Sequence, residues 1–320
     1  MFSRQIMERK YTMKSFWNRL LSTFAFILLI SITACGQTAL ATPAPVEATA
    51  TLPATVTPAP TLQPSDSTRT VTVDGVERSY LLHIPPGVDS VHAVPLVFAF
   101  HGAGEQPTTM QLSSGFDEVA DKGHFVLVYP EGLGNTWNGG GVCCGYALTN
   151  NIDDKAFVRE MLSDLGTIVS IDAKRIYATG FSNGAILSYR LACEMSDVFA
   201  AIAPVAGTLD YSPCEPQQPV SVLHVQGMAD RQVPADGGGQ LGFPPLDQVI
   251  ATWVDLNDCA SSATVDNPIE KITHSTYSSC EAGTAVELYA IEAGGHAWVS
   301  KYVFPMSQTI WDFFAAHPKP

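Results

Sequence analysis

A serine flanked by glycines lies between a strand-forming segment and a helix-forming segment. The pentapeptide GFSNG at 180–184 follows the apolar run at 176–179 and precedes a helix-forming stretch at 185–191. A reactive serine on a sharp strand-to-helix turn needs this layout, because larger side chains than glycine would clash where the strand and the helix converge. Ser182 is therefore the candidate nucleophile. The pattern predicts acyl transfer if a histidine and an acid follow along the chain.

The acid and the histidine are expected after the serine, each just beyond a strand. Asp230 follows the apolar strand predicted at 220–226, and its carboxylate would fix the histidine tautomer and stabilise the imidazolium. His296 lies in a loop with two glycines, after the strand predicted at 286–291. The alternative residues for these two roles are Asp210, Asp236 and His317.

Acyl transfer also needs donors for the oxyanion. The backbone N–H of Asn183, at the start of the predicted helix, is the first expected donor. The second is expected from the loop that follows the early apolar strand at 94–100, either from Ala103 or from Gly104. Trp137 and Trp298 lie near the site in sequence, and each is expected either to line the substrate site or to pack in the core.

The first 65 residues have a composition unlike the rest of the chain. Five basic residues precede a short apolar run that ends at Cys35, as in a secretory signal. The segment that ends in Ile-Thr-Ala-Cys resembles a lipobox, which implies cleavage before Cys35 and lipidation of its thiol. Residues 1–34 are thus predicted to be a lipoprotein signal peptide. Residues 35–65, rich in Thr, Pro and Ala, are predicted to be a solvated tether.

Residues 66–320 are long enough for a single domain with a large core. Buried strands alternate with helical segments, including helices predicted at 153–170, 246–256 and 306–316. This alternation predicts an α/β fold with a mostly parallel central sheet and helices on both faces. The net charge of −14 disfavours nucleic acid as a partner.

The cysteine count favours disulfides in an oxidising compartment. Six of the seven cysteines lie in the predicted domain, and an even number in an exported protein is typical of disulfide bonding. The pairs Cys259–Cys280 and Cys193–Cys214 are the candidates, and the adjacent Cys143 and Cys144 could bond to each other or to distant partners. The cysteine spacing is not that of a zinc site, so no metal is expected.

Several segments resemble the family of secreted polyhydroxybutyrate depolymerases and feruloyl and acetylxylan esterases. The matching segments are 100–104, 129–132, 137–138, 143–145, 153–154, 180–194, 203–207, 227–239 and 294–298. The resemblance implies an α/β-hydrolase fold, a Ser182–Asp230–His296 triad, and ester substrates from polyesters or plant cell walls. The chain departs from this family at Val299, where proline is common, and at Ala103, where cysteine or glycine is common.

These observations predict an extracytoplasmic, lipid-anchored serine esterase that hydrolyses carboxylic esters through an acyl-enzyme. Its partners would be an ester substrate, either an oligomer or a polymer, and the membrane through its lipid anchor alone. A monomer without a cofactor is expected. Two alternatives stay open. One is a peptidase of the same fold, and the other is a non-catalytic surface lipoprotein that binds a ligand on a hydrolase scaffold.

Overall fold

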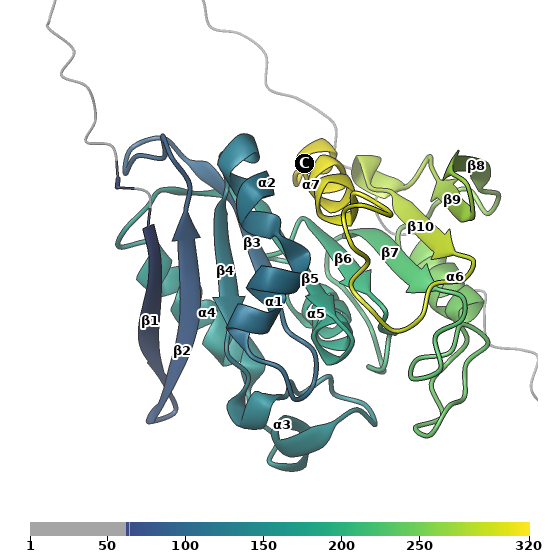
Figure 1. Cartoon of the computed structure of the whole chain (residues 1–320), viewed down its shortest axis with the longest axis horizontal. Coiled ribbons are helices and arrows are strands. Elements are labelled where there is room, and N and C mark those ends of the chain that lie inside the picture. The colour runs from purple at the N-terminus through teal and green to yellow at the C-terminus, as the bar shows by residue number, and fades with distance from the viewer. Residues whose placement is uncertain (1–61, 64) are drawn as a thin grey trace, which may run out of the picture. The chain divides into compact units, whose positions relative to one another are not determined.

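The computed structural model describes Leu62, Gln63 and residues 65–320 (Figure 1). The predicted signal peptide at 1–34, the lipidation site Cys35 and nearly all of the tether at 35–65 lie outside the described residues. Within the described part of the chain, no helix combines the length and the apolar character that a membrane span requires.

A ten-stranded sheet organises the domain, with the strand order β1-β2-β4-β3-β5-β6-β7-β10-β9-β8. The six central strands from β4 to β10 are parallel. Antiparallel hairpins complete the sheet at both edges. The strands are β1 (Ser65–Val73), β2 (Val76–Ile84), β3 (Val94–Phe100), β4 (Val126–Pro130), β5 (Ile171–Phe181), β6 (Ala201–Val205), β7 (Ser221–Gly227), β8 (Thr264–Ile269), β9 (Ile272–Tyr277) and β10 (Val286–Ile291).

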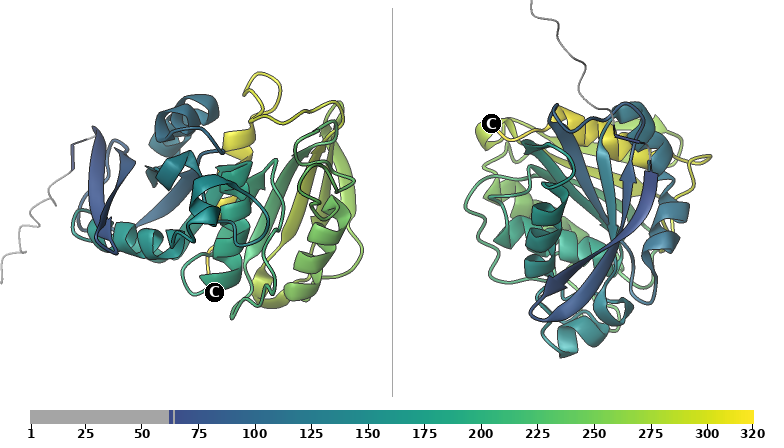
Figure 2. Two further views of the ribbon diagram at one scale, coloured as in Figure 1. Left: turned by 90° about the horizontal axis from the view of Figure 1, so that it is seen from below. Right: turned by 90° about the vertical axis from the view of Figure 1, so that its left-hand side faces the viewer.

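Helices cover both faces of this sheet, as Figures 1 and 2 show. Helices α4, α5 and α6 bury their apolar side chains against one face, and α1, α2 and α7 cover the other. The α-helices are α1 (Pro107–Ser114), α2 (Phe116–Gly123), α3 (Gly145–Thr149), α4 (Asp154–Leu165), α5 (Asn183–Glu194), α6 (Leu246–Leu256) and α7 (Met306–Ala316). The predicted α/β fold is therefore confirmed.

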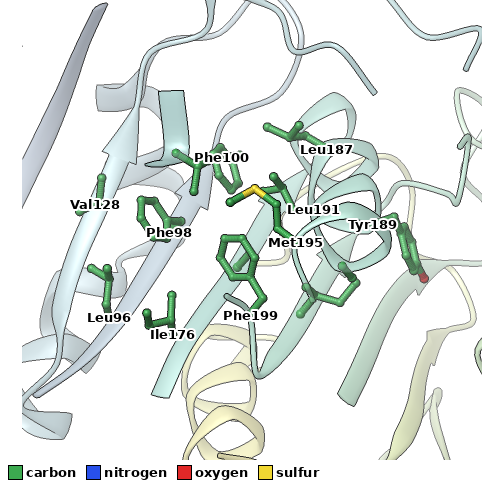
Figure 3. Close-up of a cluster of buried hydrophobic side chains, with 14 of the residues drawn as sticks. Leu96, Phe98, Phe100, Val128, Ile176, Leu187, Tyr189, Leu191, Met195 and Phe199 are labelled. Carbon is green, nitrogen blue, oxygen red and sulfur yellow. The ribbon is translucent and has the colours of Figure 1, made fainter. Parts of the chain in front are cut away.

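Continuously apolar strands contribute side chains to the core on both faces of the sheet. In β3, Phe98 and Phe100 face α5 and pack with Phe199 and Leu191 (Figure 3). The side chain of Ala99, between them in sequence, belongs to the core on the opposite face. Because successive side chains of a strand point to opposite faces, a strand covered on both sides must be apolar throughout.

Helix α4 and the hairpin of β8 and β9 differ from the sequence prediction. Helix α4 ends at Leu165 rather than continuing to residue 170, because Gly166 caps it and β-branched residues follow. The hairpin of β8 and β9 was not predicted. Strand β8 is exposed along its whole length, so it lacks the apolar alternation that marks a buried strand.

Candidate active site

Ser182 occupies the turn between β5 and α5 in a backbone conformation that few residues adopt. Its φ is 53° and its ψ is −116°. A Cβ on Gly184 would lie 2.3 Å from the carbonyl oxygen of Phe100, and a Cβ on Gly180 would lie 2.5 Å from the carbonyl carbon of Gly184. Glycine is required at both positions because β3, β5 and α5 converge here. The turn holds the Ser182 hydroxyl at the edge of the sheet where the parallel strands have their carboxyl ends.

The structure brings Ser182, Asp230 and His296 together. The Nε2 atom of His296 lies 2.9 Å from the Oγ atom of Ser182. The Nδ1 atom of the same ring lies 2.7 Å from Oδ2 of Asp230. The side chain of Asp230 is 0% exposed and that of His296 is 9% exposed. This arrangement allows Nε2 of the imidazole to accept the serine proton while the carboxylate accepts a hydrogen bond from the Nδ1–H group.

Backbone contacts between two loops hold Asp230 and His296 close to each other. The loops follow the neighbouring parallel strands β7 and β10. The N–H of Ala229 donates to the carbonyl oxygen of Gly294 at 2.8 Å. A Cβ on Gly227 would lie 2.4 Å from that same oxygen. The loops can approach this closely because Gly227 has no side chain, and Asp230 and His296 meet as a result.

Two backbone N–H groups near Ser182 have no acceptor among the residues that the structure describes. One belongs to Asn183, the first residue of α5, and the other to Ala103, which is exposed. The N–H of Gly104, the alternative donor in the sequence analysis, is engaged because it donates to the carbonyl oxygen of Asn135 at 2.8 Å. The geometry therefore favours Ala103 over Gly104 as a donor for an oxyanion.

The side chain of Asn183 anchors the start of α5 to the segment around Trp137. Its Oδ1 atom accepts from the backbone N–H of Trp137 at 2.6 Å, and its Nδ2 atom donates to the carbonyl oxygen of Trp137 at 3.1 Å. The indole N–H of Trp137 donates to the carbonyl oxygen of His101 at 2.9 Å. Trp137 thus connects the two backbone segments that carry the free N–H groups of Asn183 and Ala103.

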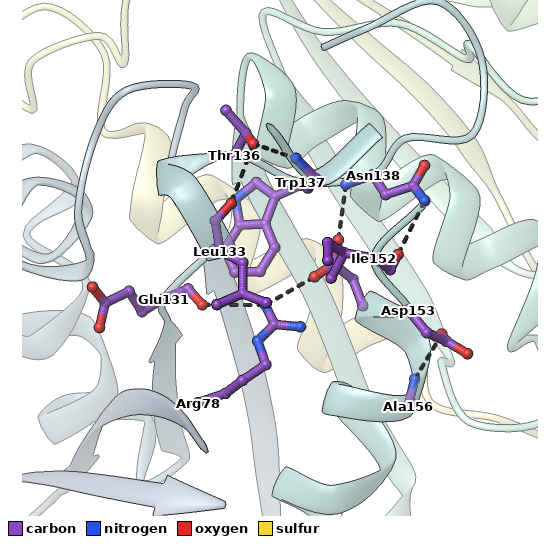
Figure 4. A network of polar contacts seen from close by, with 12 residues as sticks. Arg78, Glu131, Leu133, Thr136, Trp137, Asn138, Ile152, Asp153 and Ala156 are labelled. Carbon is purple, nitrogen blue, oxygen red and sulfur yellow. Dashed lines mark hydrogen bonds and ion pairs between the residues drawn. The ribbon is translucent and has the colours of Figure 1, made fainter. Parts of the chain in front are cut away.

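Figure 4 shows the polar contacts beneath this segment. The N–H of Asn138 donates to Asp154 at 2.8 Å, and the carboxylate of Asp154 pairs with Arg78 at 2.9 Å. The guanidinium also lies over the ring of Phe157. Burial raises the pKa of Asp154 although the positive charge of Arg78 opposes the rise. This pair is fully buried, so removing one partner would leave an uncompensated charge under the Trp137 segment.

Neither tryptophan forms an open wall of the site. Trp137 is 0% exposed and packs edge-on against Phe100, so of the two roles expected for it the structure favours packing in the core over contact with a substrate. Trp298 is half-buried, packs against Phe116 and donates its indole N–H to Ser307 at 3.3 Å. Burial of a tryptophan depends on tertiary contacts that its neighbours in sequence do not reveal, so the sequence is compatible with either role for both residues.

The alternative acids and the alternative histidine lie elsewhere. Asp210 accepts the backbone N–H groups of Val142 and Cys143 at 2.7 and 2.8 Å. It therefore holds the loop that contains the cysteine pair. Asp236 is exposed on the loop after Asp230. His317 donates from Nδ1 to the carbonyl oxygen of Phe313 at the end of α7.

The structure contains three disulfide bonds among the described cysteines. These are Cys143–Cys144, Cys193–Cys214 and Cys259–Cys280. The first joins adjacent residues. Cys143 packs in a small apolar cluster with Ile186 of α5, Val233 and Phe243. The cluster thus packs α5, the helix that begins next to Ser182, against the loop that carries Asp230.

One other group of residues has ligand types that suit a cation. The candidate ligand atoms of Asp66, His83 and Asp117 lie within 4.8 Å of one another at the β1–β2 edge of the sheet. However, Nδ1 of His83 lies 2.6 Å from Asp66 and Nε2 lies 3.0 Å from Asp121. Burial lowers the pKa of His83, but the carboxylates outweigh it and the net pKa is raised. This group is an ion-pair cluster, distant in the sheet from Ser182.

Sequence reasoning missed two buried polar residues of β7 that lie behind Asp230. His224 and Gln226 are 0% and 1% exposed. The available signal was their alternation within an apolar strand, VLHVQ, which places both on the same face. Buried polar side chains require hydrogen-bond partners, and both residues have them.

Burial of His224 predicts that acid weakens the fold. Burial lowers the pKa of His224 from 6.5 to about 4. Between these values the unfolded chain binds more protons than the folded one, so stability falls as the pH drops from 6.5 to 4 and this loss levels off below that. The expected loss from this group at pH 4.5 is roughly 2–3 kcal/mol. Urea unfolding at pH 7 and pH 4.5 should show a smaller pH effect in His224→Gln than in the unmodified protein. An equal pH effect in both proteins would contradict the assignment.

Sequence comparison connects this chain with known esterases. Residues 78–236 match the family described as Esterase PHB depolymerase. A Nocardia uniformis subsp. tsuyamanensis protein assigned as an esterase, NocK, is 29% identical over 307 residues, which are 87% of this chain and 89% of that protein. Feruloyl esterase B from Piromyces equi is 28% identical over 236 residues, which are 69% of this chain and 42% of that protein.

The fold is also found in solved esterase structures. The acetyl xylan esterase from Aspergillus awamori superposes with a TM-score of 0.55 at 14% sequence identity. The superposition covers 78% of this chain and 99% of that one. At this level of identity the likeness shows the α/β-hydrolase fold alone.

Proposed function

We propose that this chain is a carboxylic ester hydrolase of the family that residues 78–236 match, Esterase PHB depolymerase, and that Ser182, His296 and Asp230 form its catalytic triad. The observation that carries this proposal is the hydrogen-bonded line from Oγ of Ser182 through the His296 ring to Asp230, with distances of 2.9 and 2.7 Å. A neutral imidazole held in this way can act as the general base for the serine hydroxyl.

The reaction then runs in two halves. His296 Nε2 removes the proton from Ser182 as its oxygen attacks the ester carbonyl, and the negative charge on the carbonyl oxygen is stabilised by the N–H groups of Asn183 and Ala103. His296 then gives the proton to the leaving alcohol, and an acyl-enzyme remains. Water attacks this ester by the same steps and releases the acid.

We further propose that the substrates are esters of apolar acyl groups, of the polyester or feruloyl kind. The apolar cluster of Cys143, Ile186, Val233 and Phe243, which includes the first turn of α5 through Ile186, supports this. So do exposed apolar side chains on segments that follow the carboxyl ends of β4, β7 and β10, the edge at which Ser182 lies. These are Val142, Tyr146, Met228 and Tyr302.

The proposed location is outside the cytoplasm, with a lipid on Cys35 as the anchor. The basic and apolar residues before Cys35 support export. The three disulfide bonds of the described domain support an oxidising compartment, because such bonds are rare in the cytosol. The Thr/Pro/Ala-rich segment at 35–65 would then separate the domain from the membrane.

A substrate panel tests this proposal. We expect kcat/KM to be higher for hydroxybutyrate oligomers and methyl ferulate than for acetylated xylan, and we expect no cleavage of peptide p-nitroanilides. Faster hydrolysis of acetylated xylan than of the other two esters would contradict the apolar specificity. Cleavage of peptides without cleavage of any ester would contradict the esterase proposal itself and favour a peptidase.

A further inference from the structure

A line of hydrogen bonds runs through the protein interior behind Asp230. The hydroxyl of Tyr189 lies 2.7 Å from Nδ1 of His224. Nε2 of His224 lies 3.2 Å from Oε1 of Gln226. The amide nitrogen of Gln226 lies 3.3 Å from Oδ2 of Asp230 and 2.9 Å from the carbonyl oxygen of Val233. The chemistry proposed above does not use Tyr189, His224 or Gln226.

All four side chains of this line are buried. Tyr189 and His224 are 0% exposed, Gln226 is 1% exposed and the side chain of Asp230 is 0% exposed. Water therefore cannot easily replace a partner that is lost, and each group depends on the next for its hydrogen bond. Replacing the side chain at one end of the line is therefore expected to alter the hydrogen bonding of the side chain at the other end.

The chemistry of the acceptors fixes the direction of every hydrogen bond. The carboxylate of Asp230 and the carbonyl of Val233 can only accept, so the amide nitrogen of Gln226 must face them. Its Oε1 atom then faces His224 and needs a donor, which places the ring proton on Nε2. The lone pair of a neutral ring is consequently on Nδ1, and Tyr189 donates its hydroxyl proton to it.

The surroundings keep His224 neutral and so preserve this direction. Its register partner in the neighbouring strand β10 is Leu288, and the ring of Tyr189 stacks on that of Trp253. Burial lowers the pKa of His224 to about 4, and the hydrogen bond to Gln226 offsets this only in part. The ring therefore stays uncharged at neutral pH, with a single tautomer that both of its partners require.

We infer that Gln226 is a positioning residue for Asp230, and that its orientation is set by His224. The amide of Gln226 supplies the hydrogen bond to Oδ2, the same carboxylate oxygen that accepts from His296. The inference deepens the proposed function and rests on it. Tyr189 belongs to α5, the helix that begins next to Ser182, so the line also ties the acid to the helix of the nucleophile.

The test removes the side-chain amide of Gln226, which donates to Asp230, and measures the pH profiles of ester hydrolysis. Gln226→Leu is expected to lower kcat about tenfold with little change in KM, because one hydrogen bond to a charged group is lost. The acid limb of kcat/KM should move to higher pH by about half a unit, because a carboxylate with one donor fewer attracts the protonated imidazole more strongly. Tyr189→Phe should shift both quantities in the same direction by a smaller amount.

Asn257→Leu is the matched control. Asn257 is a fully buried amide that bridges the backbone N–H and carbonyl groups of Val220, at the other end of β7 from Asp230. Its replacement should destabilise the fold and leave the acid limb in place. If Gln226→Leu does not fold, Tyr189→Phe alone decides the inference, since it removes one hydroxyl and keeps the ring.

Unchanged kcat and an unchanged acid limb in the Gln226 variant, or in Tyr189→Phe if that variant alone folds, would overturn the inference. An equal shift in Asn257→Leu would also overturn it, because the effect would then follow from lost stability. Ser182→Ala is assayed alongside. If that variant is inactive while the Gln226 variant behaves like the unmodified protein, the positioning role fails and the triad stands. If Ser182→Ala stays active, the proposed function itself fails.

Discussion

Replacing Ser182 with alanine is expected to lower kcat for ester hydrolysis by about six orders of magnitude while the protein remains folded. In the proposed mechanism this hydroxyl becomes covalently bonded to the acyl carbon, and no other hydroxyl lies in the described contacts of His296 Nε2. Without it, only the water reaction assisted by the oxyanion donors would remain. Steady-state hydrolysis of p-nitrophenyl butyrate, with circular dichroism to check the fold, measures this effect.

Ser188→Ala provides the matched control for this substitution. Ser188 is buried in α5, six residues after Ser182, and its hydroxyl donates to the carbonyl oxygen of Gly184 at 2.9 Å. The hydroxyl is bonded within the helix, so we expect kcat to stay within a few-fold of the unmodified protein. Retained activity in Ser182→Ala would remove the serine from the mechanism.

Replacing Asp230 with asparagine should lower kcat by about 10⁴-fold, because it forces the wrong tautomer on His296. Oδ1 of Asp230 accepts the backbone N–H groups of Gln232 and Val233 at 2.8 and 3.0 Å. An asparagine must therefore keep its oxygen there and turn its NH₂ group toward His296. Nδ1 would then have to accept, which places the ring proton on Nε2, where it faces Ser182 and prevents proton removal.

Asp236→Asn is the control for this second substitution. Asp236 is an exposed acid of the same loop. Its replacement with asparagine removes one negative charge, as Asp230→Asn does. Its kcat should equal that of the unmodified protein. A loss in Asp236→Asn as large as that in Asp230→Asn would mean that the local charge matters and the tautomer does not.

The features predicted from sequence were those encoded by local pattern. The periods of apolar residues gave the bounds of α6 and α7 correctly, because each helix has a single apolar face on the core. The glycines around Ser182 indicated a tight turn, and the structure shows that Gly180 and Gly184 have no room for a Cβ. Short-range sequence carries this information because the strand, the turn and the helix are contiguous.

The features that sequence did not reveal depend on contacts between distant segments. Trp137 is buried because Phe100 and His101 lie against it, and neither is near it in the chain. The orientation of Gln226 depends on Tyr189 and His224, which come from two elements that meet only in the folded domain. Ala103 is favoured over Gly104 as an oxyanion donor because the Gly104 N–H already donates to the carbonyl oxygen of Asn135, a contact between segments that are distant in the chain.

Mass spectrometry of the fluorophosphonate-labelled protein tests the central claim most directly, because it identifies the nucleophile without any choice of substrate. The account predicts one probe molecule per chain, attached to the peptide that contains Ser182, and no labelling of Ser182→Ala. Labelling at another serine, or stoichiometric labelling of Ser182→Ala, would contradict it.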